Sequence, residues 1–418
     1  MIKSAKLKAV VSLVNSILVN NGIESVIHSF EAGRRGKPDE IDDSIAQLIG
    51  SYILNENRDY RFDIRILGQW NNEQDIPKVQ VQGEFSETLL RKEGLYQDIC
   101  DIVINHYNKV NRTEFTKDTF EVIFEPTPQS DTLSTNGYAG DSGHAVAVAY
   151  KDTPNHLPWE RFISVGLRDL IDSIFENEGV IPDEFAGKGN VLYLPNLGSD
   201  GKVQVDAEYV GAYFEKLTRI TLALEQKENL DVETLRKKIN PVVNSYLHFL
   251  ETKYDVYLGN PEIIVNGRGN WYNKDAGWKV DKGNREAKPH RHVFSTYGVA
   301  TDSITGEDPT KPDLTASLMS RYIACQIVGN GLADYARVTL SYCIGREGMS
   351  VGINTNNTAK VSQKTIEQWI SQNVSLGIND AISYFGLKDS DLYEKLANDS
   401  DFFQDENLLW NKVDLKYY

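Results

Sequence analysis

Cysteine, methionine and positive charge are all scarce in this chain of 418 residues. It has 3 cysteines and 3 methionines, and 44 Lys and Arg stand against 60 Asp and Glu, so the formal net charge is −16. Three scattered cysteines exclude a disulfide framework and a cysteine zinc site. The acidic balance argues against a protein that binds nucleic acid through its phosphate backbone. A small anionic ligand remains compatible with it, because a local basic cluster can bind one.

Long hydrophobic runs are also missing, since no segment approaches the roughly 20 apolar residues of a membrane-spanning helix. Ala9–Val19 is apolar and follows three lysines, as in a signal peptide. Its apolar residues have helical spacing, Asn20-Asn21-Gly22 ends the pattern, and no small-residue cleavage site follows. We therefore expect an amphipathic helix of a cytoplasmic protein. Cys100, Cys325 and Cys343 lie in apolar periodic segments, which predicts reduced, buried thiols.

The composition, with 40% hydrophobic and 25% charged residues, is that of a folded globular protein. Helix and strand patterns recur in the order helix, strand, strand, helix, about once in each third of the chain. Loop-rich segments at Pro126–Gly143 and Asn266–Lys288 separate the thirds. We predict an α+β fold of three similarly built domains, with helices on one face of each sheet. The expected boundaries are 1–127, 128–262 and 263–418.

Individual elements follow from the periodicity of apolar residues. The predicted helices cover about 38–53, 90–107, 162–175, 232–254, 313–328 and 363–384, with a charged tail after the last. The predicted strands cover about 62–66, 79–81, 120–124, 144–150, 191–194, 203–214, 217–224, 263–265, 338–344 and 351–354.

Common catalytic motifs are missing from the sequence. There is no Walker A loop, G-x-G-x-x-G, H-E-x-x-H, EF-hand loop or G-x-S-x-G. His290 and His292 would suit a metal pair on one strand face, but Arg291 between them and the lack of a nearby third ligand favour a polar lining. Four clusters instead combine carboxylate or Lys with Gly in loops or at the ends of elements. They are Gly36–Asp39, Ala139–Gly143, Ser199–Lys202 and Gly306–Asp313.

Two of these clusters place an aspartate in the first turn of a predicted helix, Asp39 and Asp313. Each by itself is explained by capping, because a carboxylate there accepts hydrogen bonds from the free N–H groups and complements the helix dipole. Four such clusters together favour a site for Mg²⁺ and polyphosphate. Carboxylates bind hard cations, and Lys or Arg binds phosphate oxygens.

The clusters belong to an ordered series of motifs. The series runs through Gly36-Lys-Pro-Asp39, Gly83-Glu84, Ala139-Gly-Asp-Ser-Gly143, Asp200-Gly-Lys202, Asp275-Ala-Gly277, Ser295-Thr-Tyr-Gly298, Gly306-Glu-Asp-Pro-Thr-Lys-Pro-Asp313, Ser320–Ala324, Gly331–Asp334 and Leu340–Gly345. It resembles the methionine adenosyltransferase (S-adenosylmethionine synthetase) family over about residues 30 to 390.

The resemblance implies three α+β domains related by pseudo-threefold symmetry. It implies the formation of S-adenosylmethionine from ATP and L-methionine, with release of phosphate and pyrophosphate. Mg²⁺ is the implied cofactor, and K⁺ is a further one in bacterial members. Family members are homodimers or dimers of dimers with shared active sites, so a second copy is the expected partner. Neither nucleic acid nor a membrane is expected.

Site residues are carried over by position in the motifs. Asp39 and Asp313 match Mg²⁺-coordinating aspartates, Lys202 and Lys311 match lysines on the triphosphate, and Lys37 remains able to hold a phosphate oxygen. Asp141 and Asp275 match aspartates near adenosine and the methionine amino group, and Glu84 matches a methionine-site glutamate. The basic residue that holds phosphate is Arg291 if the alignment is anchored on Ser295–Gly298, and Arg285 if it is anchored on Gly283-Asn284.

Four positions depart from the family pattern. Lys37 replaces a histidine, Glu40 and Glu307 each replace a lysine, and Arg65 stands near the position of a strand glutamate linked to K⁺ in bacterial members. An anion at position 307 beside a triphosphate requires compensation by a metal or by Lys311. The alternative interpretation is a divergent non-catalytic or regulatory homologue that binds nucleotide or pairs with an active subunit.

Overall fold

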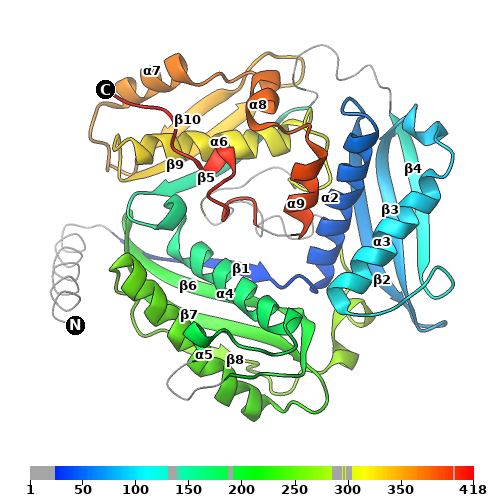
Figure 1. Ribbon diagram of the computed structural model, residues 1–418. Helices are drawn as coiled ribbons and strands as arrows, with labels where there is room; N and C mark the ends of the chain where they lie inside the picture. The colour runs from blue at the N-terminus through cyan, green and yellow to red at the C-terminus, as the bar shows by residue number, and fades with distance from the viewer. Residues whose placement is uncertain are drawn as a thin grey trace. The chain divides into compact units, whose positions relative to one another are not determined.

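The computed structural model describes residues 24–129, 139, 141–186, 192–284, 294, 297, 304–398 and 401–418. Residue contacts divide the chain into two compact units. The first comprises the chain up to Lys37 and Pro158–Gly277, and the second comprises Pro38–Leu157 and Trp278–Tyr418. Each unit therefore combines two separate stretches of sequence (Figure 1). The predicted N-terminal helix lies outside the described residues.

The first unit is built on a four-stranded sheet of order β1-β6-β7-β8. Its strands are β1 (Ser25–Gly33), β6 (Leu197–Val210), β7 (Tyr213–Gln226) and β8 (Glu262–Val265). Neighbouring strands are antiparallel except β7 and β8. These two are parallel because helix α5 (Val232–Tyr254) returns the chain between them. Helix α4 (Trp159–Glu176) packs on β1 and β6.

The two faces of this sheet have different surroundings. Phe30 and Ala32 of β1 cluster with Val165 of α4, so they lie on the face that this helix covers. Because successive residues of a strand point to opposite faces, Glu31 lies on the other face. Lys202 of β6 is opposite Gly33 in the strand register and shares that second face. The alternation thus places charged groups on the sheet face away from α4.

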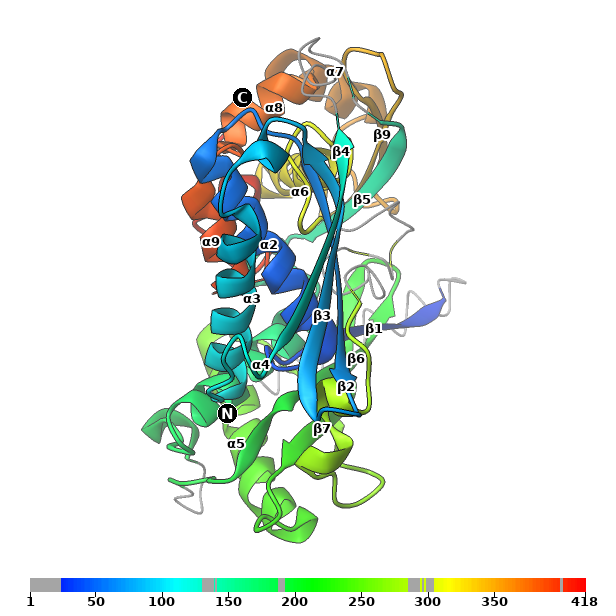
Figure 2. The ribbon, with the colours of Figure 1, turned by 90° about the vertical axis from the view of Figure 1, so that its right-hand side faces the viewer.

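The second unit contains two sheets, of which the first has the order β2-β3-β4. Its strands are β2 (Phe62–Asn71), β3 (Ile76–Ser86) and β4 (Glu121–Gln129), with β2 and β3 antiparallel and β3 and β4 parallel. Figure 2 shows helices α2 (Pro38–Glu56), α3 (Leu95–Asn111) and α9 (Ser390–Asn398) on one side of these strands. Pro38 suits the first turn of α2 because that position needs no N–H donor.

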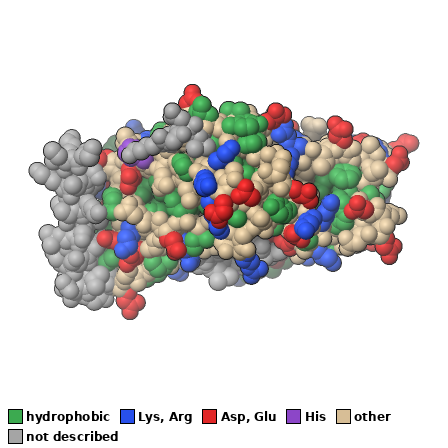
Figure 3. All heavy atoms as spheres, turned by 90° about the horizontal axis from the view of Figure 1, so that it is seen from below, with side chains coloured by type: hydrophobic (Ala, Val, Ile, Leu, Met, Phe, Trp, Pro, Cys, Tyr) green, Lys and Arg blue, Asp and Glu red, His purple; other side chains and the backbone are tan. Residues whose placement is uncertain are grey.

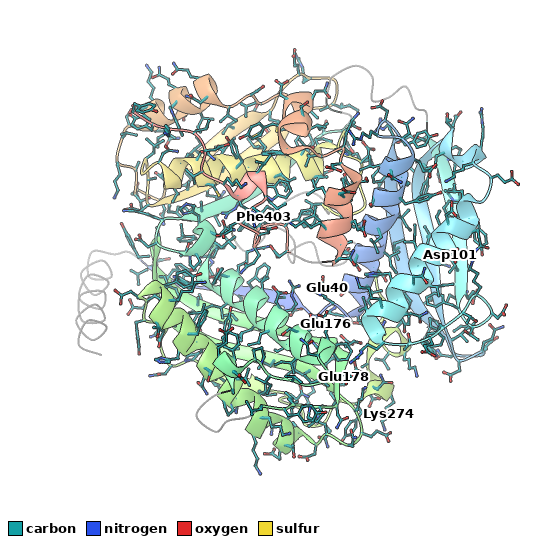
Figure 4. The ribbon with its side chains drawn as sticks, in the orientation of Figure 1. Glu40, Asp101, Glu176, Glu178, Lys274 and Phe403 are labelled. Atoms are coloured by element: carbon teal, nitrogen blue, oxygen red, sulfur yellow. The ribbon has the colours of Figure 1, made fainter. Side chains whose placement is uncertain are left out.

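The other sheet of the second unit has the order β10-β9-β5 and is antiparallel. Its strands are β5 (Gly143–Tyr150), β9 (Tyr335–Tyr342) and β10 (Ser350–Asn354), and its helices include α6 (Pro312–Gly329), α7 (Gln363–Asn373) and α8 (Ile378–Phe385). Helix α6 packs on β5 and β9 and is buried along nearly its whole length. Trp410 and Phe403 in the C-terminal segment are buried too, at 1% exposure each. Phe403 is labelled in Figure 4.

None of the described helices has both the length and the apolar character that crossing a bilayer requires. On the face seen in Figure 3, Lys and Arg side chains alternate with Asp and Glu. Charges of the two signs are therefore mixed on this face and do not form a single basic stripe.

The α+β class and most of the predicted elements are confirmed, including the helices now seen as α2, α4, α5 and α6. The strands predicted over 203–214 and 217–224 correspond to β6 and β7, but the predicted boundary between them is wrong, because the chain turns at Gly211. Of the strand predicted over 191–194, the described residues 192–194 contain a single β-bridge, at Tyr193. The predicted domain boundaries and the pseudo-threefold relation stay predictions.

The C-terminal region differs most from the sequence-based expectation. The helix predicted over 363–384 is two helices, because Val374 is extended and Gly377 begins the cap of α8. The expected charged tail contains a further helix, α9, and the buried Trp410. Cys100 and Cys325 are buried as predicted, but Cys343 is exposed. The reason is that β9 ends at Tyr342, so Cys343 lies beyond the covered part of the sheet.

Candidate functional site

Lys311, one of the predicted phosphate-binding residues, precedes α6 in the second unit. Its Nζ donates a hydrogen bond to Asp63 Oδ2 at 2.5 Å and lies 3.8 Å from Glu84 Oε2. The side chains of Lys311 and Asp63 are 12% and 10% exposed. Burial acts to lower the pKa of Lys311, but the attraction of Asp63, Glu307 and Glu84 outweighs it and raises this pKa. Lys311 therefore keeps its positive charge at neutral pH.

Strand register assembles this carboxylate cluster. Asp63 on β2 stands opposite Glu84 on β3, so the two side chains share one face of the sheet. The segment before α6 runs beside β2, where the Ile64 N–H donates to the Gly306 carbonyl at 2.8 Å. Glu307 forms a backbone bridge with Asp63 and is 3% exposed. The anion at position 307 thus has a cation, Lys311, within electrostatic reach.

The two predicted metal ligands stand in the first turns of different helices of the second unit. Asp39 in α2 is 3% exposed, and Asp313 in α6 is 6% exposed. The hydroxyl of Tyr342 on β9 donates a hydrogen bond to Asp313. Within the described residues, no three His, Cys, Asp or Glu side chains are grouped to hold a metal. Mg²⁺ often takes only one or two carboxylates and completes its shell with water and phosphate oxygens, so these aspartates fit an ion that arrives with polyphosphate.

Asp200 is a buried carboxyl group of the first unit whose pKa is raised. It is 5% exposed and accepts hydrogen bonds from the N–H groups of Gly277, at 2.9 Å, and Gly201, at 2.6 Å. Its pKa is raised to about 6, chiefly by burial and also by the charge of nearby Glu225, against the opposing effects of the Gly277 hydrogen bond and the charge of Lys37. The motifs at positions 200–202 and 275–277 therefore meet, with Lys37 close enough to influence Asp200.

A buried arginine fixes the loop that carries Lys37. Arg34 is 0% exposed, and its guanidinium donates to Asp172 Oδ1 and to the Gly198 carbonyl, both at 2.7 Å. Gly36 packs so closely on Ser199 that an added Cβ would lie 2.3 Å from the Ser199 Cβ. A side chain at position 36 would therefore push the loop away from β6. Glycine is required there by this close approach.

The remaining predicted residues of the first unit are more exposed. Lys202 Nζ bonds Glu31 Oε2 at 2.8 Å, and its side chain is 39% exposed on the sheet face away from α4. Asp275 is exposed in a short helical turn, where its carbonyl accepts a hydrogen bond from the Trp271 indole at 2.6 Å. In this structure Lys202 is paired with Glu31, and Asp275 lies two residues from the Gly277 that binds Asp200.

Asp141 is exposed in a loop of the second unit that pairs with the chain after β9. The Ile344 N–H donates to Ser142 Oγ at 2.7 Å, and the Gly345 N–H donates to the Ala139 carbonyl at 3.1 Å. The motifs at 139–143 and 340–345 are thus neighbours. Arg285 and Arg291 lie outside the described residues, so the choice between them stays open.

Sequence reasoning missed Asp63 as a member of the site. The alternation of Phe62, Ile64 and Ile66 already placed Asp63 on the opposite face of β2, beside Arg65. Its partner Lys311 is 248 positions away in the sequence, and no local pattern links the two. The acidic group therefore became recognisable only once the segment before α6 was seen to run along β2.

Comparisons with known proteins agree with the motif series. Residues 288–412 match the family model described as S-adenosylmethionine synthetase, C-terminal domain. S-adenosylmethionine synthases of Acholeplasma laidlawii and of a Methylobacterium species are 25% and 24% identical to this chain, covering 93% and 92% of it and 97% and 95% of the relatives. That of Staphylococcus epidermidis is 28% identical over 66% of this chain and 65% of the relative.

The C-terminal part of the chain thus matches the S-adenosylmethionine synthetase family model, and nearly the whole chain is similar to S-adenosylmethionine synthases at about 25% identity. Its four departures from the S-adenosylmethionine synthetase motifs differ in their surroundings. Lys37 and Glu307 are buried, at 5% and 3% exposure. Glu40 is partly buried in the first turn of α2 (Figure 4), and the Arg65 side chain is 65% exposed, 3.9 Å from Asp63. Of the four departures, Lys37 and Glu307 are therefore the two that place an ionisable side chain in the interior.

Proposed function

We propose that this protein is a cytoplasmic methionine adenosyltransferase, which forms S-adenosylmethionine from ATP and L-methionine and releases phosphate and pyrophosphate. The observation that carries the proposal is the meeting of the predicted motifs within each unit. Lys311 lies beside Glu84 in the second unit, and Asp200 is hydrogen-bonded to Gly277 in the first. Relatives named S-adenosylmethionine synthase that align over more than nine-tenths of the chain support the same reaction.

In this reaction the methionine sulfur attacks C5′ of ATP and triphosphate leaves. The protein has to align the reacting atoms and stabilise the charge of the leaving group. We assign the phosphate oxygens to Lys37, Lys202, Arg291 and Lys311, and the methionine and adenosine contacts to Glu84, Asp141, Asp275 and Arg285. Asp39 and Asp313 would hold Mg²⁺, which neutralises part of the triphosphate charge when bound.

The direct test is to incubate the purified protein with ATP, L-methionine, Mg²⁺ and K⁺ and to detect S-adenosylmethionine by mass spectrometry. We expect product that disappears when Mg²⁺ is chelated. Omitting K⁺ in a parallel reaction tests the second cofactor separately. An absence of product above background at every metal composition would overturn the catalytic proposal.

A non-catalytic homologue is the second candidate function, and the four departures from the family motifs favour it. Lys37, Glu40, Arg65 and Glu307 all fall in or near the ATP and metal site that the resemblance implies. Light scattering together with calorimetric titration of Mg-ATP distinguishes the two candidates. A homodimer that binds Mg-ATP supports the enzyme. A monomer that does not bind nucleotide supports a regulatory subunit that needs an active partner.

A further inference from the structure

The Lys311 ammonium group uses only part of its hydrogen-bonding capacity. An ammonium has three N–H donors. Within the described residues its one hydrogen bond goes to Asp63, because Glu84 at 3.8 Å lies beyond hydrogen-bond distance. Asp63 therefore holds one N–H donor of Lys311, and the other donors are available to an anion.

Asp63 is held more firmly than the lysine that it contacts. Its backbone is paired on both sides, with Glu84 of β3 and with Glu307 in the segment before α6. Its short side chain has few rotatable bonds, whereas the lysine side chain has four and loses about 2 kcal/mol of rotamer entropy when it is fixed. Asp63 is thus the rigid member of the pair, and it determines where the ammonium lies.

Glu84 offers Lys311 a second, competing carboxylate. Its side chain is 44% exposed, and its Oε2 also accepts a hydrogen bond from Gln129 Nε2. Without the Asp63 charge, the flexible Lys311 chain has this partner within 4 Å. A lysine that turned toward Glu84 would direct its donors elsewhere.

We propose that Asp63 is a positioning residue, which fixes the Lys311 ammonium so that its remaining N–H groups meet a phosphate oxygen of the substrate. The inference rests on the proposed function, in which Lys311 contacts the triphosphate of ATP. A purely electrostatic role predicts the opposite behaviour. Removing a negative charge near an anion site would then strengthen anion binding and leave kcat unchanged.

The test compares Asp63→Asn, which keeps the shape and removes the charge, with Asp63→Glu, which keeps the charge. For each variant we would measure kcat and KM for ATP, and the Kd for Mg-tripolyphosphate by calorimetry. The matched control is Asp59→Asn. Asp59 also pairs with a lysine at 2.5 Å, Lys388, but the two side chains are 79% and 36% exposed.

We expect Asp63→Asn to lower kcat by about 10- to 100-fold, since a misplacement of about 1 Å can cost 10²-fold, with a smaller change in KM. Asp63→Glu should restore part of the loss, and Asp59→Asn should match the wild type. If Asp63 acts through Lys311, Asp63→Asn should have no further effect on the Kd once Lys311→Met is present.

Different results overturn different parts of the inference. Unchanged kcat with tighter tripolyphosphate binding in Asp63→Asn would overturn the positioning role alone. A lower unfolding temperature of Asp63→Asn with wild-type kinetics would show that Asp63 has only a structural role. A wild type that makes no S-adenosylmethionine but loses tripolyphosphate affinity through Asp63→Asn would overturn the catalytic proposal and keep the positioning role. A wild type that does not bind tripolyphosphate overturns both.

Discussion

Asp200 in the first unit is buried and Lys311 in the second is largely buried, and burial is the largest single influence on the pKa of each. Burial favours the neutral form of either group. For Asp200 it prevails and raises the pKa to about 6, against the opposing charge of Lys37. For Lys311 the combined attraction of Asp63, Glu307 and Glu84 prevails, and its pKa rises above the ordinary lysine value.

The difference between the two groups lies in the number of opposite charges around them. Among the described residues, Lys37 lowers and Glu225 raises the pKa of Asp200, whereas the three carboxylates Asp63, Glu307 and Glu84 all raise that of Lys311. Burial alone therefore does not decide whether a group stays charged. The first unit contains a carboxyl that changes charge just below neutral pH, and the second contains a cation that keeps its charge throughout.

Removing the cation of the second unit should have the largest effect on stability. Lys311→Met leaves Asp63, Glu84 and Glu307 without their common partner, and breaking such a buried pair costs about 3 kcal/mol or more. The free energy of unfolding in urea measures this loss. Lys388→Met removes the exposed pair with Asp59 and should cost less than about 1 kcal/mol. Equal losses in the two variants would contradict the importance of burial.

The pH dependence of stability should differ between the units. The folded pKa of Asp200, about 6, lies above its unfolded value of 3.8, so the folded state binds this proton more tightly. The contribution to unfolding free energy is therefore most favourable below pH 4 and falls by at most about 3 kcal/mol as the pH rises through 6. Asp200→Asn should abolish this slope. The difference in unfolding free energy between the wild type and Asp200→Asn, measured from pH 4 to pH 7, tests this prediction.

His106 of the second unit provides a contrast of opposite sign. Burial lowers its pKa from 6.5 to about 4, and its Nε2 lies 2.6 Å from Ser44 Oγ. Its contribution to stability is therefore complete above pH 6.5 and is lost as the pH falls toward 4. Amide hydrogen exchange, measured on peptide fragments, reports the stability of each unit separately. Parallel pH slopes in both units would contradict these assignments.

Asp313→Asn separates a metal ligand from a helix cap. If Asp313 binds Mg²⁺, the variant should lose the formation of S-adenosylmethionine. Its free energy of unfolding should fall by only about 1 kcal/mol, the usual effect of losing a cap. Mass spectrometry of the product and a thermal unfolding curve are the two measurements. A destabilised variant with a wild-type rate would show that the aspartate only stabilises the first turn of α6 and accepts the Tyr342 hydrogen bond.

Arg65→Ala should have the smallest effect. The Arg65 side chain is 65% exposed and lies 3.9 Å from Asp63, so solvent screens the pair. We expect a change in unfolding free energy below about 0.5 kcal/mol and an unchanged kcat. A loss comparable to that of Lys311→Met would show that the carboxylate cluster depends on its exposed neighbour as well.

The elements of the fold were predictable where apolar periodicity was long. The spacing from Ile41 to Ile53 predicted α2, and the alternation of Phe62, Ile64 and Ile66 predicted β2, because each pattern buries one face. Local turn chemistry was harder to read. The break at Gly377 interrupts an apolar run that looks continuous in sequence, so α7 and α8 were predicted as one helix. The turn at Gly211 was predicted a few residues too late, between the strands over 203–214 and 217–224.

The sequence by itself determined the family motifs, the alternation of helices and strands, and which charged residues were available, since these depend on local pattern and composition. Only the tertiary structure decided which charges meet. Lys311 and Asp63 are 248 positions apart, and Gly277 and Asp200 are 77 apart. These contacts depend on strand register and on how each segment packs. Burial and neighbouring charge then set the pKa of each group, and both are properties of the folded chain.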